Sequence, residues 1–257
     1  MALTNRLRSD AGKVNDDFTQ NTELRWRQVY YVFIDYRIYF YALIYTCISA
    51  VNKYLTSFLP LLLVDGMGSY QPKVHLMIVP LYVIACIFCL LIAYSSSRWN
   101  NHGYHLVLCL VVALLGIILM IALIDGGTVA IYTSICIACT GVLSAFSLVV
   151  SWLTNNIDGQ TKRPMAVGFI MGIGQIGGII LPLVRFLLIY HDNLSNNRRA
   201  CCICIGIITV SLIATLVLRY CLMLENRRRD RLTSEQFKRE EAIKEPCDWH
   251  PSRRYVL

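Results

Sequence analysis

Acidic residues are scarce in this sequence, and none lies in the interior of its long apolar blocks. Among 257 residues there are 16 Asp and Glu against 24 Lys and Arg, and only five His. General acid–base and nucleophilic catalysis need carboxylates, imidazoles or an activated nucleophile held close together. The sequence has neither a histidine cluster nor a Gly-x-Ser-x-Gly nucleophile turn. We therefore do not expect an enzyme.

The cysteines lack the spacing of a metal site or a disulfide framework. Eleven are present, and many, such as Cys201, Cys202 and Cys204, fall inside apolar blocks. A free cysteine in such surroundings behaves as a small buried hydrophobic residue. We expect the cysteines to fill helix interfaces, and we expect no metal and no cofactor.

The polar start of the chain lacks the form of a signal peptide. Residues 1–37 are too long and too charged to be the basic region ahead of a short apolar core. The net charge of +8 would suit a nucleic-acid-binding protein. The basic residues, however, gather in stretches that would face one side of a membrane, so we expect no nucleic acid as a partner.

Long hydrophobic runs dominate what remains. Hydrophobic residues make up 56% of the chain, above the roughly 45–50% of soluble domains, and the mean hydropathy is +0.53. They form six blocks of about twenty residues, long enough to cross a bilayer as helices. The blocks are 38–62, 76–94, 105–124, 128–151, 165–189 and 201–224. The sequence predicts an all-α membrane protein with an N-terminal segment 1–37, a six-helix transmembrane domain 38–224 and a polar tail 225–257.

Lys and Arg are unevenly divided between the two sides of such a domain. Eighteen lie in the N-terminal segment, the second and fourth loops and the tail, whereas three lie in the opposite loops. Cytoplasmic loops carry the excess of Lys and Arg. We therefore expect a multi-pass protein surrounded by membrane lipids, with both termini cytoplasmic and with Arg98, Lys162 and Arg163 in cytoplasmic loops.

Short motifs along most of the chain resemble one transporter family. They are Trp-Arg-Gln-Val at 26–29, Tyr-Ala-Leu-Ile-Tyr at 41–45, Ser-Phe-Leu-Pro at 57–60, Val-Pro-Leu-Tyr-Val-Ile-Ala at 79–85, Ser-Trp-Leu-Thr-Asn-Asn at 151–156, Gly-Gln-Thr-Lys-Arg at 159–163, Gly-Ile-Gly-Gln-Ile-Gly-Gly-Ile-Ile at 172–180, Glu-Asn-Arg-Arg-Arg-Asp at 225–230 and His-Pro-Ser-Arg-Arg-Tyr at 250–255. The chain resembles the C-terminal half of fungal permeases in the anion:cation symporter branch of the major facilitator superfamily, which includes allantoate, nicotinate and pantothenate permeases.

The resemblance implies that the six blocks are helices seven to twelve of a twelve-helix fold and that segment 1–37 corresponds to its central loop. It implies transport of a small organic anion, such as one of those carboxylates, coupled to protons in the plasma membrane. It also implies a partner, the N-terminal six-helix half, because substrate binds between the halves near the bilayer midplane. One motif departs from the family, since Ser97 stands where an acid is expected before Arg98. With no carboxylate inside the blocks, the other half would carry the proton, or the substrate would enter protonated.

The first block carries a polar stripe that suggests a substrate site. Tyr45, Ser49, Asn52 and Lys53 recur at spacings of three and four, which places them on one helix face. A lysine at the centre of a spanning helix costs about 2.5–3.5 kcal/mol to insert, so it is a functional candidate. We hypothesise that these residues bind the anion, together with Gln175, which resembles a cavity position of such permeases. The alternative is a shifted helix that brings Lys53 to the outer interface.

The fifth block is rich in glycine. Two pairs spaced by four residues leave room for a neighbouring helix backbone, and a proline further along can kink the helix. We expect these residues to act in helix packing or gating: Gly168, Gly172, Gly174, Gly178 and Pro182.

Other classes of membrane protein fit the sequence less well or equally well. A mitochondrial carrier would show a threefold repeat with Pro-x-Asp/Glu signatures, and an aquaporin would show paired Asn-Pro-Ala motifs; neither occurs. A truncated relative that binds or regulates a full-length transporter without transporting would share every feature above. The sequence also leaves open whether the chain comes from an incomplete gene model, is a truncated paralogue, or is a half that pairs with another chain.

Overall fold

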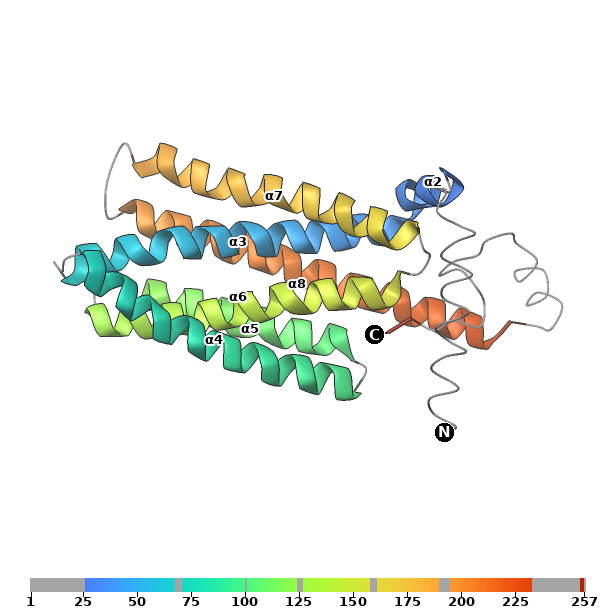
Figure 1. The fold of residues 1–257 in the computed structure, drawn as a ribbon, viewed down its shortest axis with the longest axis horizontal. Coiled ribbons are helices and arrows are strands. Elements are labelled where there is room, and N and C mark those ends of the chain that lie inside the picture. The colour runs from blue at the N-terminus through green and yellow to red at the C-terminus, as the bar shows by residue number, and fades with distance from the viewer. Residues whose placement is uncertain are drawn as a thin grey trace, which may run out of the picture.

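The computed structural model describes residues 26–67, 71–99, 101–123, 127–157, 161–189, 195–232 and 255–256. Its described elements are helices: a short α2 (Trp26–Ile34) and six long ones, α3 (Tyr36–Met67), α4 (Gln71–Trp99), α5 (His102–Ala122), α6 (Thr128–Asn156), α7 (Lys162–Ile189) and α8 (Ser195–Asp230). The long helices run side by side, alternating in direction, as Figure 1 shows. The prediction of an all-α bundle with six long helices is confirmed.

Most of the long helices are apolar enough to cross a membrane. Within the described residues, five segments meet that requirement: Ile78–Trp99, His102–Ala122, Val129–Asn156, Lys162–Leu181 and Arg198–Asp230. Helix α3 is not among these described segments, and the described part of its sequence contains several tyrosines together with Asn52 and Lys53. The chain is therefore a multi-pass integral membrane protein.

Helices α3 and α8 extend beyond the predicted blocks. Helix α3 begins at Tyr36, before position 38, and α8 continues to Asp230, beyond position 224. The last turn of α8 holds Arg227, Arg228 and Arg229, where cations interact favourably with the helix dipole. The polar residues at this junction therefore lengthen the helix instead of ending it.

Close packing concentrates on two helix pairs, α5 with α6 and α3 with α7. Between α5 and α6 the backbones nearly touch, because a Cβ added at Gly141 would lie 2.7 Å from the Cys109 carbonyl oxygen. Helix α6 is the most central of the spanning helices, with 61% of its most apolar window buried, whereas only 11% of the α4 window is buried. Helix α4 therefore stands at an edge and leaves most of its surface uncovered by this chain.

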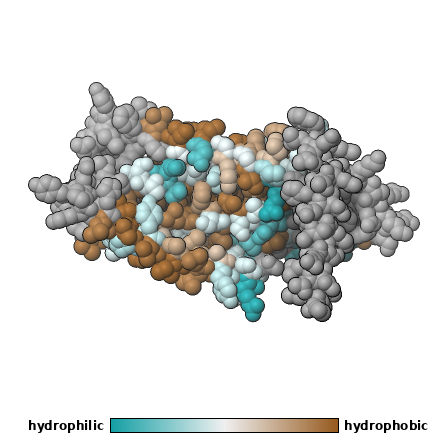
Figure 2. Space-filling model, viewed as in Figure 1, coloured by the Kyte–Doolittle hydropathy of each residue, from teal (hydrophilic) through white to brown (hydrophobic). Residues whose placement is uncertain are grey.

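One face of the bundle differs from the others in polarity. Figure 2 shows hydrophobic side chains along the upper and lower borders of this face and paler, partly hydrophilic ones between them. In the same orientation α7 lies along the upper border and α4 along the lower one, with α3 and α6 between them (Figure 1). The polar strip therefore lies where α3 and α6 are open to the outside of the chain, and we call it the open face.

Candidate functional site

Lys53 lies near the middle of α3 with an exposed side chain. It is residue 18 of the 32 that form the helix (Tyr36–Met67), so roughly 21 Å of helix separates it from the Met67 end. It shares an exposed helix face with Tyr39, Leu43 and Ser57. Its ammonium group makes no hydrogen bond or ion pair with the other described residues. A cation is thus presented at mid-helix without a partner from the described chain.

Helix α6 adds polar groups that the sequence analysis did not single out. Thr133, Ser147 and Asn155 are exposed, and their separations of fourteen and eight residues place them near one face of the helix. The Thr133 hydroxyl donates to the Ala130 carbonyl oxygen at 2.9 Å, and that of Ser147 to Leu143 at 3.3 Å. The Thr133 hydroxyl is satisfied within its own helix, whereas the Ser147 hydroxyl oxygen also accepts from the Cys89 thiol of α4 at 3.4 Å. The spacing of Thr133 and Ser147 in the fourth predicted block, with Asn155 just beyond its end, could have indicated this face.

The rest of the predicted stripe is turned toward protein. Tyr45 and Ser49 are 3% and 2% exposed, Asn52 is half-buried, and the Tyr45 ring packs on Phe146 of α6 with 5.1 Å between the centroids. Glycines of α7 make this fit possible, because a Cβ at Gly178 would lie 3.2 Å from the Ser49 hydroxyl oxygen. The structure therefore separates Lys53, which is exposed, from Tyr45 and Ser49, which are packed between helices.

The two glycine pairs of α7 lie on different faces. Gly174 contacts the Tyr45 ring and Gly178 faces Ser49 and Lys53, whereas no described atom lies within 4 Å of a Cβ added at Gly168 or Gly172. Close packing against α3 is therefore found at the second pair, mainly through side chains of α3, whereas the first pair lies on an exposed face. The side chain of Gln175 is exposed, and that of Pro182 lies outside the described residues.

A buried ion pair joins Asp35, which lies between α2 and α3, to α7 at the end of the bundle where α2 lies, which we call the α2 end. The Lys162 Nζ is 2.9 Å from the Asp35 Oδ2, and the two side chains are 1% and 2% exposed. Arg37 approaches the other carboxylate oxygen, with its Nε 3.5 Å away. In a low-dielectric site an unpaired charge is costly, so each member of such a pair holds the other in place. No local pattern in the sequence connects Asp35 with Lys162, which are far apart in the chain.

The expectation that Arg98, Lys162 and Arg163 lie in loops is corrected by the structure. Arg98 is in the last turn of α4, and α7 begins at Lys162. Arg98 and Arg163 are exposed, whereas Lys162 is buried. The physical reason is the Asp35 carboxylate, which draws Lys162 into the helix interface while its neighbour stays in solvent or among headgroups.

Tyr255 and Val256 also lie at the α2 end. Tyr255 is 3% exposed, and its ring is flanked by the guanidinium groups of Arg37 and Arg229, 4.3 and 4.4 Å from its centroid. The pair contacts side chains from α3, α6 and α8. The motif ending at Tyr255 was part of the family resemblance, but nothing in the sequence indicated where it would bind.

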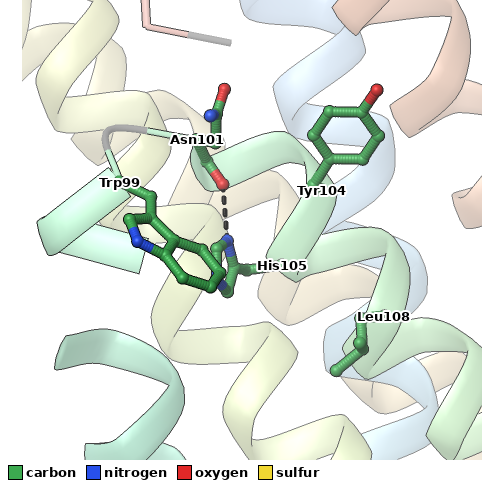
Figure 3. Close-up of a pocket in the computed structure, with 5 residues that line it drawn as sticks. All are labelled: Trp99, Asn101, Tyr104, His105 and Leu108. Atoms are coloured by element: carbon green, nitrogen blue, oxygen red, sulfur yellow. Dashed lines mark hydrogen bonds between the residues drawn. The ribbon is translucent and has the colours of Figure 1, made fainter. Parts of the chain in front are cut away.

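A pocket of about 270 Å³ lies where α4 meets α5 and is lined by Trp99, Asn101, Tyr104, His105 and Leu108. Figure 3 shows His105 beside the Trp99 ring, with its Nδ1 2.7 Å from the Asn101 carbonyl oxygen. The other ring nitrogen is 3.0 Å from the Ser95 hydroxyl oxygen. Because both nitrogens are engaged in holding the helix junction, this pocket is a weaker candidate for a ligand site than the open face.

Metal ligands are not grouped in the described part of the chain. Among those residues, no set of three or more His, Cys, Asp or Glu side chains is arranged to hold a metal ion. The exposed polar side chains of α3 and α6 named above, Lys53, Ser57, Thr133, Ser147 and Asn155, offer hydroxyls, an amide and an ammonium group, which suit recognition of a ligand by charge and hydrogen bonds.

The sequence matches the family model described as Major Facilitator Superfamily over residues 2–182. This chain belongs to the Major Facilitator Superfamily. The family consists of transporters, so the chain is a transporter-family protein and not an enzyme. The six long helices are those of a partial major facilitator fold, in agreement with the predicted fold class.

Several fungal transporters are similar to this major facilitator chain. An uncharacterised transporter of Schizosaccharomyces pombe is 26% identical over 84% of this chain and 42% of its own length. A major facilitator-type transporter of Emericella nidulans is 24% identical over 82% and 42%. A high-affinity nicotinic acid transporter of Saccharomyces cerevisiae is 25% identical over 67% and 32%. The chain thus spans less than half the length of these relatives.

Proposed function

We propose that this chain is the C-terminal half of a fungal-type transporter that moves a small organic anion across the plasma membrane. Its six long helices would be helices seven to twelve, and the α2 end would face the cytoplasm, where the excess of Lys and Arg belongs. The observation that carries the proposal is Lys53, an exposed cation in the middle of α3. Within a major facilitator bundle, that position is where a substrate anion would be met.

The cost of burying a charge explains why Lys53 is a functional candidate. A lysine at the centre of a spanning helix is unfavourable by about 2.5–3.5 kcal/mol, so such residues face protein or a water-filled cavity. Lys162, the other lysine in the described part of α3 and α7, is neutralised by Asp35. Lys53 lacks such a counterion among the described residues. A carboxylate substrate would supply the missing charge.

The distribution of exposed apolar residues supports a complementary six-helix half as the partner. On α4, Leu90, Leu91 and Tyr94 are 66%, 63% and 74% exposed, and on α7 Ile176 and Ile179 are 58% and 66% exposed. These helices border the polar open face (Figure 2). A second half laid over that face would enclose Lys53 in a cavity between the halves.

The name of one relative and the positive charge of Lys53 favour a carboxylate as the substrate. The Saccharomyces cerevisiae relative is named as a nicotinic acid transporter, and nicotinate carries the carboxylate that would pair with Lys53. Allantoate and pantothenate are further candidates within the anion:cation symporter branch. Proton coupling would rely on a carboxylate of the complementary half, because Asp35 is paired with Lys162 at the α2 end.

Uptake measurements in yeast lacking the corresponding permease test this function. The chain is expressed alone and together with the N-terminal half of a full-length relative, and uptake of labelled nicotinate, allantoate and pantothenate is followed. Lys53→Gln removes one charge-assisted contact with the substrate, which contributes about 1.5–3 kcal/mol. The apparent affinity should therefore fall roughly ten- to a hundredfold. Lys53→Arg should retain most of it, and Arg163→Gln, which alters an exposed cation at a helix end, serves as the control.

Two outcomes would contradict the proposal. Unchanged affinity in Lys53→Gln would remove Lys53 from the substrate site. Absence of uptake in both expression formats, with the chain present in the membrane, would favour the alternative of a non-transporting protein that binds or regulates a full-length transporter.

A further inference from the structure

The main chain of residues 255–256 is completely paired with side chains at the α2 end. The Asn226 amide donates to the Tyr255 carbonyl oxygen at 2.9 Å and accepts from the Tyr255 N–H at 2.9 Å. The Asn156 amide does the same for Val256, at 2.9 and 2.7 Å. The Trp152 indole N–H also donates to the Val256 carbonyl oxygen at 2.8 Å. Each asparagine thus imitates a neighbouring β-strand for one residue of the segment.

The Tyr255 side chain adds selectivity to this main-chain recognition. Its hydroxyl accepts from the Arg229 guanidinium at 2.7 Å, and its ring lies between Arg229 and Arg37. Arg229 is itself held by Glu225, 3.2 Å away. A tyrosine is therefore favoured here over other residues, because the site offers cations for the ring face and a donor for the hydroxyl.

We propose that the α2 end carries a peptide-binding site whose ligand is the chain's own Tyr255–Val256 segment, and that the bound segment clamps α6 to α8. We call Asn156, Trp152, Asn226 and Arg229 the tail site. This proposal does not depend on the transported substrate.

The tail site lies where a bound segment would connect the ends of α6 and α8. Asn156 ends α6 and also donates to the Tyr41 hydroxyl of α3 at 2.8 Å, whereas Asn226 and Arg229 belong to the last turns of α8. Helices α6 and α8 are not among the pairs that pack extensively on each other. The segment therefore connects two helix ends that have little direct contact.

Hydrogen exchange measured by mass spectrometry on the purified full-length chain tests the clamp. In the wild type, the amides of Tyr255 and Val256 should exchange at least about tenfold more slowly than in an unstructured peptide of the same sequence. Asn156→Ala should abolish that protection and also speed exchange at the end of α6. Tyr255→Ala, which leaves every helix side chain in place, should speed exchange at the ends of both α6 and α8.

Asn155→Ala is the matched control, because Asn155 neighbours Asn156 but its Nδ2 lies 3.1 Å from the His102 Nε2 of α5. It should leave the exchange of Tyr255 and Val256 unchanged. Unprotected amides at 255–256 in the wild type would overturn the binding site. Equal loss of protection in Asn155→Ala and Asn156→Ala would overturn its specificity, and unchanged helix ends in Tyr255→Ala would overturn the clamp.

Discussion

The two lysines of the α3–α7 pair are treated in opposite ways by their surroundings. Lys162 is 1% exposed at the α2 end, with its ammonium 2.9 Å from the Asp35 carboxylate. Lys53 lies in the middle of α3 with an exposed side chain and no described counterion. The same chemical group therefore acts as a structural tie at one place and as a candidate for ligand recognition at the other.

Charge alone therefore does not identify a functional residue in a membrane bundle. A buried ion is tolerated when a counterion and hydrogen bonds compensate for its lost hydration. Where the chain supplies that counterion, as at the α2 end, the charge holds helices together. Where the described chain does not, as at Lys53 in the middle of α3, the compensation is left to water, to lipid or to a substrate.

Removing one member of the buried ion pair should have the largest effect on stability. Lys162→Met leaves Asp35 buried with less compensation, so the free energy of unfolding in detergent should fall by about 3–5 kcal/mol. Chemical denaturation followed by circular dichroism measures it. The double variant Asp35→Leu/Lys162→Met should recover much of the loss, and the exposed neighbour in Arg163→Met should change little. Equal effects of Lys162→Met and Arg163→Met would contradict the structural role of the pair.

Close packing of α7 on the middle of α3 should give the next largest effect. A Cβ at Gly177 would lie 2.9 Å from the Thr46 carbonyl oxygen, so Gly177→Ala must push the helices apart and should destabilise the chain by about 1–3 kcal/mol. Gly172→Ala has open space around the new methyl group and should be neutral or stabilising by up to about 1 kcal/mol. Thermal unfolding in one detergent compares them, and a loss of stability in Gly172→Ala of the same size would refute the two-face description of α7.

A single hydroxyl at the α2 end should contribute less to the free energy of unfolding than the ion pair does. Tyr41→Phe keeps the ring that packs edge-on against Trp152, with 5.3 Å between the centroids, but removes the acceptor for the Asn156 amide. We expect a loss of about 0.5–1.5 kcal/mol. Tyr39→Phe removes an exposed hydroxyl that donates to the Phe33 carbonyl oxygen at 2.8 Å and should have a smaller effect. If both variants unfold together at the wild-type midpoint, the Tyr41 contact does not stabilise the fold.

Lys53 should have the smallest effect on stability of the four sites. Because its side chain is exposed, Lys53→Gln should change the free energy of unfolding by no more than about 0.5 kcal/mol. The changes in the free energy of unfolding caused by Lys53→Gln and Lys162→Met, measured in the same detergent, give the sharpest contrast between the two regions. If Lys53→Gln lowered the free energy of unfolding as much as Lys162→Met does, Lys53 would be a structural residue despite its exposed side chain.

Much of the bundle was predictable because hydrophobic length alone sets it. Blocks of about twenty apolar residues predicted six long helices, and the first block, interrupted by Asn52 and Lys53, corresponds to helix α3. The helix ends were less predictable. Arg98 and Lys162 were expected in loops, yet both belong to helices, because polar residues continue a helix as readily as they end one when their side chains find partners or solvent.

The candidate site was predictable only in part. The spacing of Tyr45, Ser49 and Lys53 indicated one face of α3, but the glycines of α7 cover part of that face, so only the lysine remains exposed. Helical spacing describes a face without saying which neighbour covers it. The polar residues of α6 and the binding of Tyr255 were missed for the same reason, since both depend on which helices become neighbours.

The sequence by itself determined that this protein is a bundle of membrane-spanning helices with its basic residues concentrated between particular blocks, because insertion into lipid depends on local hydrophobicity and charge. The tertiary structure alone decided which polar residues are occupied with each other. Asp35 finds Lys162, and Asn156 and Asn226 find residues 255–256, through contacts between segments that are distant in the chain. Pairing of this kind depends on three-dimensional proximity, and no local pattern encodes it.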